Sequence, residues 1–193
     1  MSPDWQDAHW IGERGLDAKY HGEQWHAPSS WMNPNPYAKK PTFAIVRNPY
    51  DRIISEYHHL SKESHDTPKK MQKWIDDNLT RIVQFKHFPG HFLPQHFYII
   101  SPSGKQIINH VIRYETLEEE FPKLMEQYKL SEIVLPPKKK FVAPTFNTQW
   151  TNQHLTSELI ARINDIYLRD FDELGYTMVT DPSEFQTPTL VST

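Results

Sequence analysis

An arginine and a serine stand on either side of a tight turn in the segment RNPYDRIISEY, residues 47–57. A guanidinium presents a planar fork that matches two oxygens of a phosphate, and a serine hydroxyl adds a further donor. The Asn-Pro pair after the arginine predicts the start of a helix, and the amides of a helix N-terminus favour an anion. The spacing therefore indicates a phosphate site built from Arg47 and Ser55. The alternative is that Arg47 pairs with Asp51, or with a carboxylate near the C-terminus, and only stabilises the turn.

The same segment resembles the second cofactor motif of sulfotransferases that use 3′-phosphoadenosine 5′-phosphosulfate (PAPS), Arg-(Asp/Asn)-Pro-x-x-Arg-x-x-Ser-x-Tyr, at every fixed position. The resemblance implies PAPS as the co-substrate, with Arg47 and Ser55 holding its 3′-phosphate. Three further stretches are similar to the carbohydrate branch of this family, which acts on heparan- and chondroitin-type acceptors: HFLPQ (91–95), VIRYETLEEEFPKL (111–124) and ELIARINDIYLRDFDELGY (158–176). The resemblance spans roughly residues 19–178 and implies a glycan, or another hydroxyl-bearing molecule, as the acceptor.

Transfer of a sulfuryl group to a hydroxyl requires a base for the acceptor's proton, and histidine suits this role because its pKa of ~6.5 lies near working pH. The resemblance implies a catalytic histidine just before the strand that carries the arginine. The stretch KYHGEQWHAPSSW (19–31) supplies His21 and His26 there. Because WHAP resembles the Trp-His-x-Pro element of the carbohydrate branch, His26 is the preferred base and His21 the second candidate. The alternative for each is a surface or packing histidine.

The other half of the family's donor site has no counterpart before Arg47. That half is a strand–loop–helix with the P-loop pattern Gly-x-x-x-x-Gly-Lys-(Ser/Thr), or a looser lysine-containing form, which grips the 5′-phosphosulfate. The closest stretch is GERGLDAK (12–19), whose charged, helix-prone interior suits an anion poorly. We therefore expect a three-layer, P-loop-NTPase-like parallel sheet flanked by helices, with the first strand and its phosphate loop missing from this chain.

Three explanations for the missing motif stay open. The chain is a truncated form of a longer enzyme, or a protein partner or self-association completes its sheet, because an open sheet edge invites pairing. In the third explanation the chain is a catalytically inactive relative that serves as a structural or assembly subunit, which is our alternative to the enzyme. The lack of a Walker lysine counts against a nucleotide binder of the kinase type.

Three consecutive lysines, Lys138, Lys139 and Lys140, lie in a proline-marked loop. In the family this loop closes over the nucleotide or an anionic acceptor, so the resemblance implies a cofactor-binding role and favours a sulfated or carboxylated glycan. The alternative is a solvated run of charges.

Other polar residues receive weaker interpretations. We interpret Arg113 as structural, pairing with Glu115, and Gln95 as either a substrate contact or an amide that orders a loop. The histidine clusters at 58–65 and 87–96 lack the HExxH spacing and the nearby carboxylates of a metal site, so we expect no metal.

Hydrophobic periodicity predicts the elements that must position these residues. We expect buried strands at 42–46 and 107–114, and a further strand that ends at Ile100. A turn is predicted at 101–105, and Gly175 is predicted to stop the last helix. Helices are predicted at about 49–62, 68–85, 116–128 and 156–172. Alternating strands and helices indicate an α/β fold with a parallel sheet.

Composition limits the class of protein. The 193 residues suit a single domain, whole or partial, with a flexible tail at 180–193. A net charge of −3 argues against a nucleic-acid binder. The absence of cysteine excludes disulfides and thiolate metal sites. No apolar run is long enough for a membrane span and no signal peptide is evident, so we expect a soluble, cytoplasmic protein without membrane partners.

Overall fold

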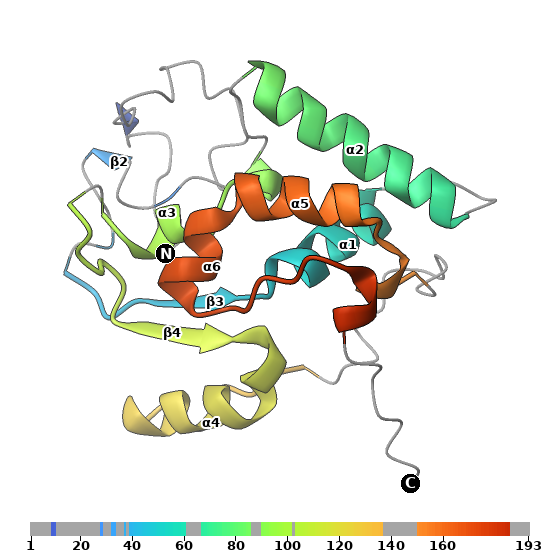
Figure 1. Ribbon diagram of the computed structural model, residues 1–193. Coiled ribbons are helices and arrows are strands. Elements are labelled where there is room, and N and C mark those ends of the chain that lie inside the picture. Colours follow the sequence, from blue (N-terminus) through green and yellow to red (C-terminus); the bar gives the residue numbers. More distant parts are fainter. Residues whose placement is uncertain are drawn as a thin grey trace, which may run out of the picture. The chain divides into compact units, whose positions relative to one another are not determined.

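The computed structural model describes residues 9–10, 28, 32–33, 37, 39–60, 67–85, 90–101, 103–136 and 150–185. The ribbon of the chain is shown in Figure 1. The chain divides into two compact units, which we describe separately. The first unit comprises residues 1–47 and 81–142, and the second comprises residues 48–80 and 143–193. One boundary therefore passes between Arg47 and Asn48, inside the RNPYDRIISEY segment.

A parallel pair of strands forms the centre of the first unit. β3 (Phe43–Val46) pairs with β4 (His110–Arg113) in a register that places Phe43 opposite His110 and Val46 opposite Arg113. Both strands fall where apolar runs predict them, and together with the helices they confirm the α/β class. The described residues show two parallel strands in this sheet, and the three-layer, P-loop-like arrangement stays a prediction.

Helix α4 (Leu117–Gln127) packs against this sheet and confirms the helix predicted at 116–128. Its Phe121 ring meets the Phe43 ring edge-on, with centroids 6.1 Å apart. Ile112 of β4 joins Phe121, Leu124 and Met125 in a buried apolar cluster. The 3₁₀ turn η5 (Tyr114–Thr116) connects β4 to α4, so the strand end and the helix start are separated by one turn.

The segment before β4 differs from its prediction. Instead of a strand that ends at Ile100, the chain forms the 3₁₀ turn η4 (Gly90–Phe92) and the short helix α3 (His96–Ile99). The carbonyl of Pro94 accepts the amide of Phe97, which starts the helical turn. A short apolar run is compatible with a buried helix as well as a strand, and pattern alone does not separate the two. The predicted turn at 101–105 is present, with Gly104 at φ +80°.

Two other strands of the first unit, β1 (His9–Trp10) and β2 (Met32–Asn33), pair antiparallel.

Helix α2 (Pro68–Phe85) has the bounds that its apolar spacing predicts, and the unit boundary falls inside it, after Thr80. Its buried residues recur every three or four positions, as expected for an amphipathic helix: Met71, Ile75, Leu79 and Ile82. Of the helices described, none has both the length and the apolar content needed to cross a bilayer.

Helix α1 (Pro49–Leu60) opens the second unit and confirms the predicted helix and its cap. The side-chain oxygen of Asn48 accepts the amide of Tyr50 at 3.0 Å, and the Asn48 carbonyl accepts the amide of Arg52 at 2.9 Å. An asparagine at this position satisfies amides that the first turn leaves unpaired. The local sequence Asn-Pro therefore sets where α1 begins.

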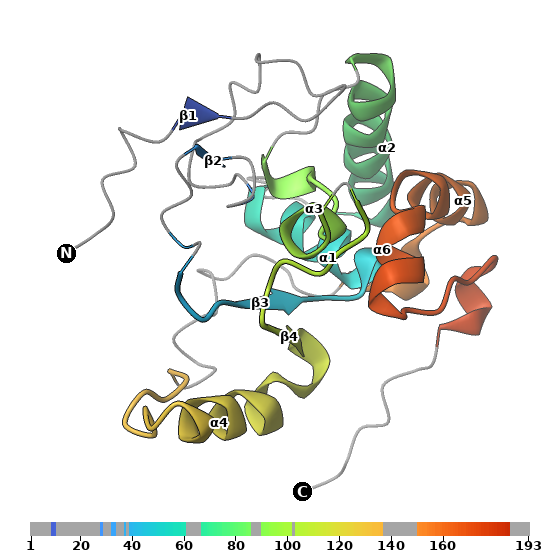
Figure 2. The ribbon, with the colours of Figure 1, turned by 90° about the vertical axis from the view of Figure 1, so that its left-hand side faces the viewer.

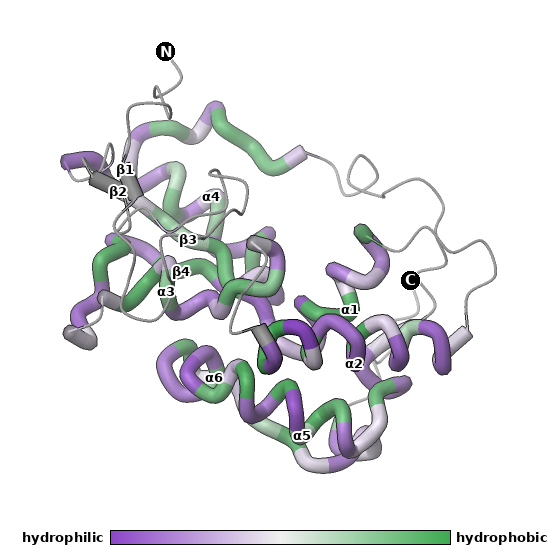
Figure 3. The backbone as a smooth tube through the Cα atoms, turned by 90° about the horizontal axis from the view of Figure 1, so that it is seen from above, coloured by the Kyte–Doolittle hydropathy of each residue, from purple (hydrophilic) through white to green (hydrophobic). Residues whose placement is uncertain are grey.

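The last predicted helix is two helices. α5 (Ser157–Ile166) and α6 (Leu168–Leu174) meet at Tyr167, where the chain changes direction (Figure 2). Neither proline nor glycine occurs at this break, so the sequence gives no local signal for it. Figure 3 shows that hydrophobic and hydrophilic residues alternate along α5, as expected for a helix with one buried side. Gly175 ends α6 at φ 66°, which confirms the predicted stop.

Short turns complete the second unit. η7 (Asn152–His154) precedes α5, and η8 (Pro182–Glu184) follows α6. η8 lies within the stretch predicted to be a flexible tail. Asp181, the residue before η8, and Glu184, its last residue, form a capping box in which Oε1 of Glu184 accepts the amide of Asp181 at 2.8 Å. Residues 186–193 of that stretch lie outside the described residues.

Candidate functional site

Arg47 follows the last paired residue of β3, and a side chain from another segment holds its backbone. The amide of Arg47 donates to Oε1 of Gln95 at 2.8 Å, and Nε2 of Gln95 donates to the Arg47 carbonyl at 2.8 Å. Gln95 lies between η4 and α3 and is only 7% exposed. One amide side chain thus satisfies both backbone groups of the arginine. Of the two interpretations given for Gln95, the ordering amide fits this geometry.

The guanidinium of Arg47 lies over an aromatic ring. Its Cζ atom is 4.5 Å from the centre of the Tyr114 ring, and Tyr114 is the first residue of η5. A guanidinium over a ring is held by a cation–π attraction, and its N–H groups stay available at its edge for an anion. Within the described part of the chain, no ion pair of Arg47 is present. Asp51, one partner that the purely structural alternative requires, accepts a hydrogen bond from Asn152 at 2.9 Å.

Ser55, the second predicted phosphate ligand, lies on α1 in the second unit. It is half-buried, and no described residue forms a hydrogen bond with its hydroxyl. The hydroxyl is therefore compatible with a ligand. Because Arg47 and Ser55 belong to different units, we describe each within its own surroundings.

The remaining fixed residues of the motif stabilise the second unit. Tyr57 is 1% exposed and packs against Trp74, with ring centroids 5.4 Å apart. Burial raises the pKa of the Tyr167 hydroxyl far above its usual range, and the charge of Arg52 acts in the opposite direction. Arg52 therefore lies close enough to the junction of α5 and α6 for its charge to act on the Tyr167 hydroxyl. The motif thus contains residues that build the fold as well as the two predicted ligands.

Tyr50, a variable position of the motif, joins α1 to the C-terminal segment. Its hydroxyl donates to Oδ1 of Asn164 and accepts the amide of Val179 at 3.0 Å. The ring is fully buried against Phe171 and Phe185. Burial is the main reason that the pKa of Tyr50 is raised.

Several predicted site residues lie outside the described residues: His21, His26, Lys138, Lys139 and Lys140. Their roles as base and as nucleotide or acceptor ligands stay predictions. Arg113 is the last residue of β4, and its side chain is exposed. Among the described residues, no group of three histidine or carboxylate side chains is arranged to hold a metal ion.

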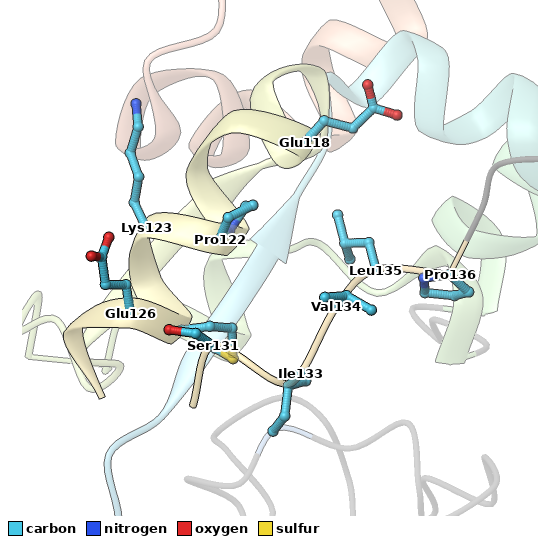
Figure 4. Close-up of a pocket in the computed structure, with 10 residues that line it drawn as sticks. Glu118, Pro122, Lys123, Glu126, Ser131, Ile133, Val134, Leu135 and Pro136 are labelled. Atoms are coloured by element: carbon cyan, nitrogen blue, oxygen red, sulfur yellow. The ribbon is translucent and has the colours of Figure 1, made fainter. Parts of the chain in front are cut away.

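A pocket of about 550 Å³ lies between α4 and residues 131–136 of the first unit (Figure 4). Its apolar surface comes from Pro122, Met125 and Leu135, among others. The charged residues that line it are two glutamates, Glu118 and Glu126, and one lysine, Lys123. This excess of carboxylates does not favour a polyphosphorylated donor, and Arg47 is not among the lining residues.

Comparison with known families places the chain in a family. Residues 17–177 match the family model described as the Sulfotransferase family, and this match covers most of the chain, so the chain belongs to that family. No curated protein and no solved structure matches it.

Proposed function

We propose that this protein is a PAPS-dependent sulfotransferase that moves a sulfuryl group to a hydroxyl of a carbohydrate-type acceptor. Membership of the sulfotransferase family supports the reaction class. The observation that carries the donor assignment is the placement of Arg47: its backbone is fixed by Gln95 and its guanidinium lies over Tyr114. A fixed guanidinium with free N–H edges is the donor set that a phosphate monoester needs.

In the proposed reaction, the acceptor oxygen forms a bond to sulfur while the bond between sulfur and the bridging oxygen of PAPS breaks. The acceptor's proton passes to His26, or to His21 as the second candidate, and 3′-phosphoadenosine 5′-phosphate (PAP) leaves. Arg47 and Ser55 bind the 3′-phosphate, which is remote from the reacting sulfur, so their role is to position the donor. Precise positioning supplies a large part of catalysis when the acceptor must attack in line.

Lys138, Lys139 and Lys140 are proposed to contact the nucleotide or an anionic acceptor, which would favour a sulfated or carboxylated glycan. We assign no residue of this chain to the 5′-phosphosulfate. A protein partner, or a second copy of the chain, is proposed to complete the sheet beside β3. Among the described strands, β4 alone pairs with β3, so the other edge of β3 is open to a further strand.

Calorimetric titration of the purified chain with PAP tests the donor assignment, with AMP as the ligand that lacks the 3′-phosphate. Arg47→Ala should weaken PAP binding by about 10- to 100-fold, because a hydrogen bond to a charged group contributes about 1.5–3 kcal/mol. AMP binding should not respond to the substitution. Arg47→Lys is the matched variant. It keeps the positive charge but loses the planar fork, so its affinity for PAP should lie between those of the wild-type chain and Arg47→Ala.

Equal affinity of the wild-type chain for PAP and AMP would contradict the donor site. A folded wild-type chain that binds neither nucleotide would favour the alternative, a catalytically inactive sulfotransferase-like subunit with a structural or assembly role.

A further inference from the structure

The contact between Gln95 and Arg47 joins residues that lie 48 positions apart in the chain. The paired register of β3 and β4 ends with Val46 opposite Arg113, so Arg47 stands one residue beyond the parallel ladder. Its peptide groups need partners other than the neighbouring strand, because a buried unpaired amide or carbonyl costs free energy. The primary amide of Gln95 can offer one N–H donor and its oxygen acceptor side by side in one plane, as these two hydrogen bonds require. Gln95 therefore supplies the partners that the ladder no longer provides for the backbone of Arg47.

This contact determines the direction in which the Arg47 side chain leaves the backbone. Two hydrogen bonds to the N–H and C=O of one residue restrict its φ and ψ, and these angles set the direction of the Cα–Cβ bond. At the other end of the side chain, Tyr114 lies 4.5 Å from the guanidinium carbon. Gln95 and Tyr114 thus hold Arg47 from both ends, one at the backbone and the other at the charged group. A protein side chain that is already ordered loses less conformational entropy when it binds a ligand.

We propose that Gln95 is a positioning residue that orders Arg47 for the 3′-phosphate of the donor, without touching the nucleotide itself. The proposal rests on the proposed function, since it names a further residue of the same donor site. It predicts that the affinity for PAP depends on the ability of residue 95 to donate to the Arg47 carbonyl and accept from the Arg47 amide at the same time.

Gln95→Glu tests this dependence through pH. A protonated carboxyl group has the shape of the amide and keeps one donor and one acceptor, so it can form both hydrogen bonds. An ionised carboxylate accepts from the Arg47 amide but repels the Arg47 carbonyl. Because burial disfavours the charged form, we expect the introduced group to titrate above the usual pKa of ~4.3. The amide of the wild-type chain does not titrate.

The measurement is the ratio of the PAP dissociation constants of Gln95→Glu and the wild-type chain. We expect this ratio to be about 10 or more near pH 8.5 and to approach 1 as the pH falls toward about 5.5. Titration of the 3′-phosphate affects both proteins alike and therefore cancels in the ratio. Circular dichroism at each pH shows that both chains are folded. A purely structural defect would give a change in stability without this pH profile in the binding of folded protein.

Gln106→Glu is the matched control. Gln106 belongs to the same unit, is exposed, and donates to the carbonyl of Ile108 at 2.8 Å. The same chemical change there should leave the ratio near 1 at every pH. Gln95→Met, which keeps the length of the side chain but removes both hydrogen bonds, should weaken PAP binding at every pH.

Distinct results separate the two proposals. If the wild-type chain does not bind PAP, the proposed function fails. If the wild-type chain binds PAP and folded Gln95→Glu or Gln95→Met binds as tightly at every pH, the role of Gln95 is overturned. Should neither variant fold, NMR of the wild-type chain gives the answer: the side-chain amide protons of Gln95 should be protected from exchange and should keep their shifts when PAP binds. Large shifts would indicate direct contact with the nucleotide and would contradict a positioning role.

Discussion

The hydroxyl of Tyr50 offers a test of how the C-terminal segment is attached to α1. Tyr50→Phe removes the bond to Asn164 and the bond from the Val179 amide, and it keeps the buried ring against Phe171 and Phe185. Each hydrogen bond contributes about 0.5–1.5 kcal/mol, so the loss of both should lower the free energy of unfolding by about 1–3 kcal/mol. Urea denaturation near neutral pH measures this change, and its slope should stay the same because the exposed area does not change.

The raised pKa of Tyr50 adds a pH dependence whose sign follows from linkage. The native state keeps the hydroxyl protonated at a pH where the unfolded chain, with a tyrosine pKa of ~10, begins to ionise. The contribution of Tyr50 to stability is therefore complete below about pH 10 and decreases as the pH rises through the native pKa. The Phe variant lacks this group, so the difference between the two proteins should narrow above about pH 10.

Tyr114→Phe is the control for this experiment, because Tyr114 is half exposed and no described residue forms a hydrogen bond with its hydroxyl. Its free energy of unfolding should change by less than about 0.5 kcal/mol. An unchanged midpoint for Tyr50→Phe, or a difference that stays constant between about pH 8 and pH 11, would refute the reasoning about the buried hydroxyl.

Two further substitutions test other features. Tyr114→Leu should weaken PAP binding about two- to fivefold, because it removes an exposed cation–π contact of about 0.5–1 kcal/mol. Tyr114→Phe keeps the ring and should retain the wild-type affinity. A loss far above tenfold in calorimetry would indicate that the ring itself contacts the nucleotide. Gly175→Ala should lower the free energy of unfolding by about 1–2 kcal/mol in urea denaturation, because Gly175 has φ 66°, and an unchanged stability would contradict this account of the end of α6.

Features that depend on neighbouring residues in the chain were predictable. Asn48 and Pro49 determine the start of α1, and Gly175 determines the end of α6, because capping acts within one helical turn. The bounds of α2 follow from the spacing of its buried side chains. The apolar run before Arg-Asn-Pro also predicted that Arg47 directly follows a strand, as it does.

Features that depend on distant residues were not predictable. The segment that forms α3 was assigned to a strand, because its apolar residues suit either structure and tertiary packing decides between them. The break at Tyr167 has no signal in the local sequence, and the charges that surround its hydroxyl come partly from α1. The hydrogen bonds between Gln95 and Arg47 were likewise not predicted, since no pattern of spacing connects residues so far apart.

The RNPYDRIISEY segment combines two kinds of constraint, and this combination has a consequence for reading the sequences of relatives. Asn48 caps a helix and Tyr57 is buried, so these positions should be retained by a relative that keeps the fold. Among the described residues, the side-chain polar groups of Arg47 and Ser55 form no hydrogen bond or ion pair, and the guanidinium of Arg47 contacts the Tyr114 ring. A relative that keeps Asn48 and Tyr57 but replaces Arg47 and Ser55 would still be recognised as a family member and would fold. Under the proposed function such a chain would lack the ligands of the 3′-phosphate and would be a pseudoenzyme, so these two positions would inform about activity more than the overall match does.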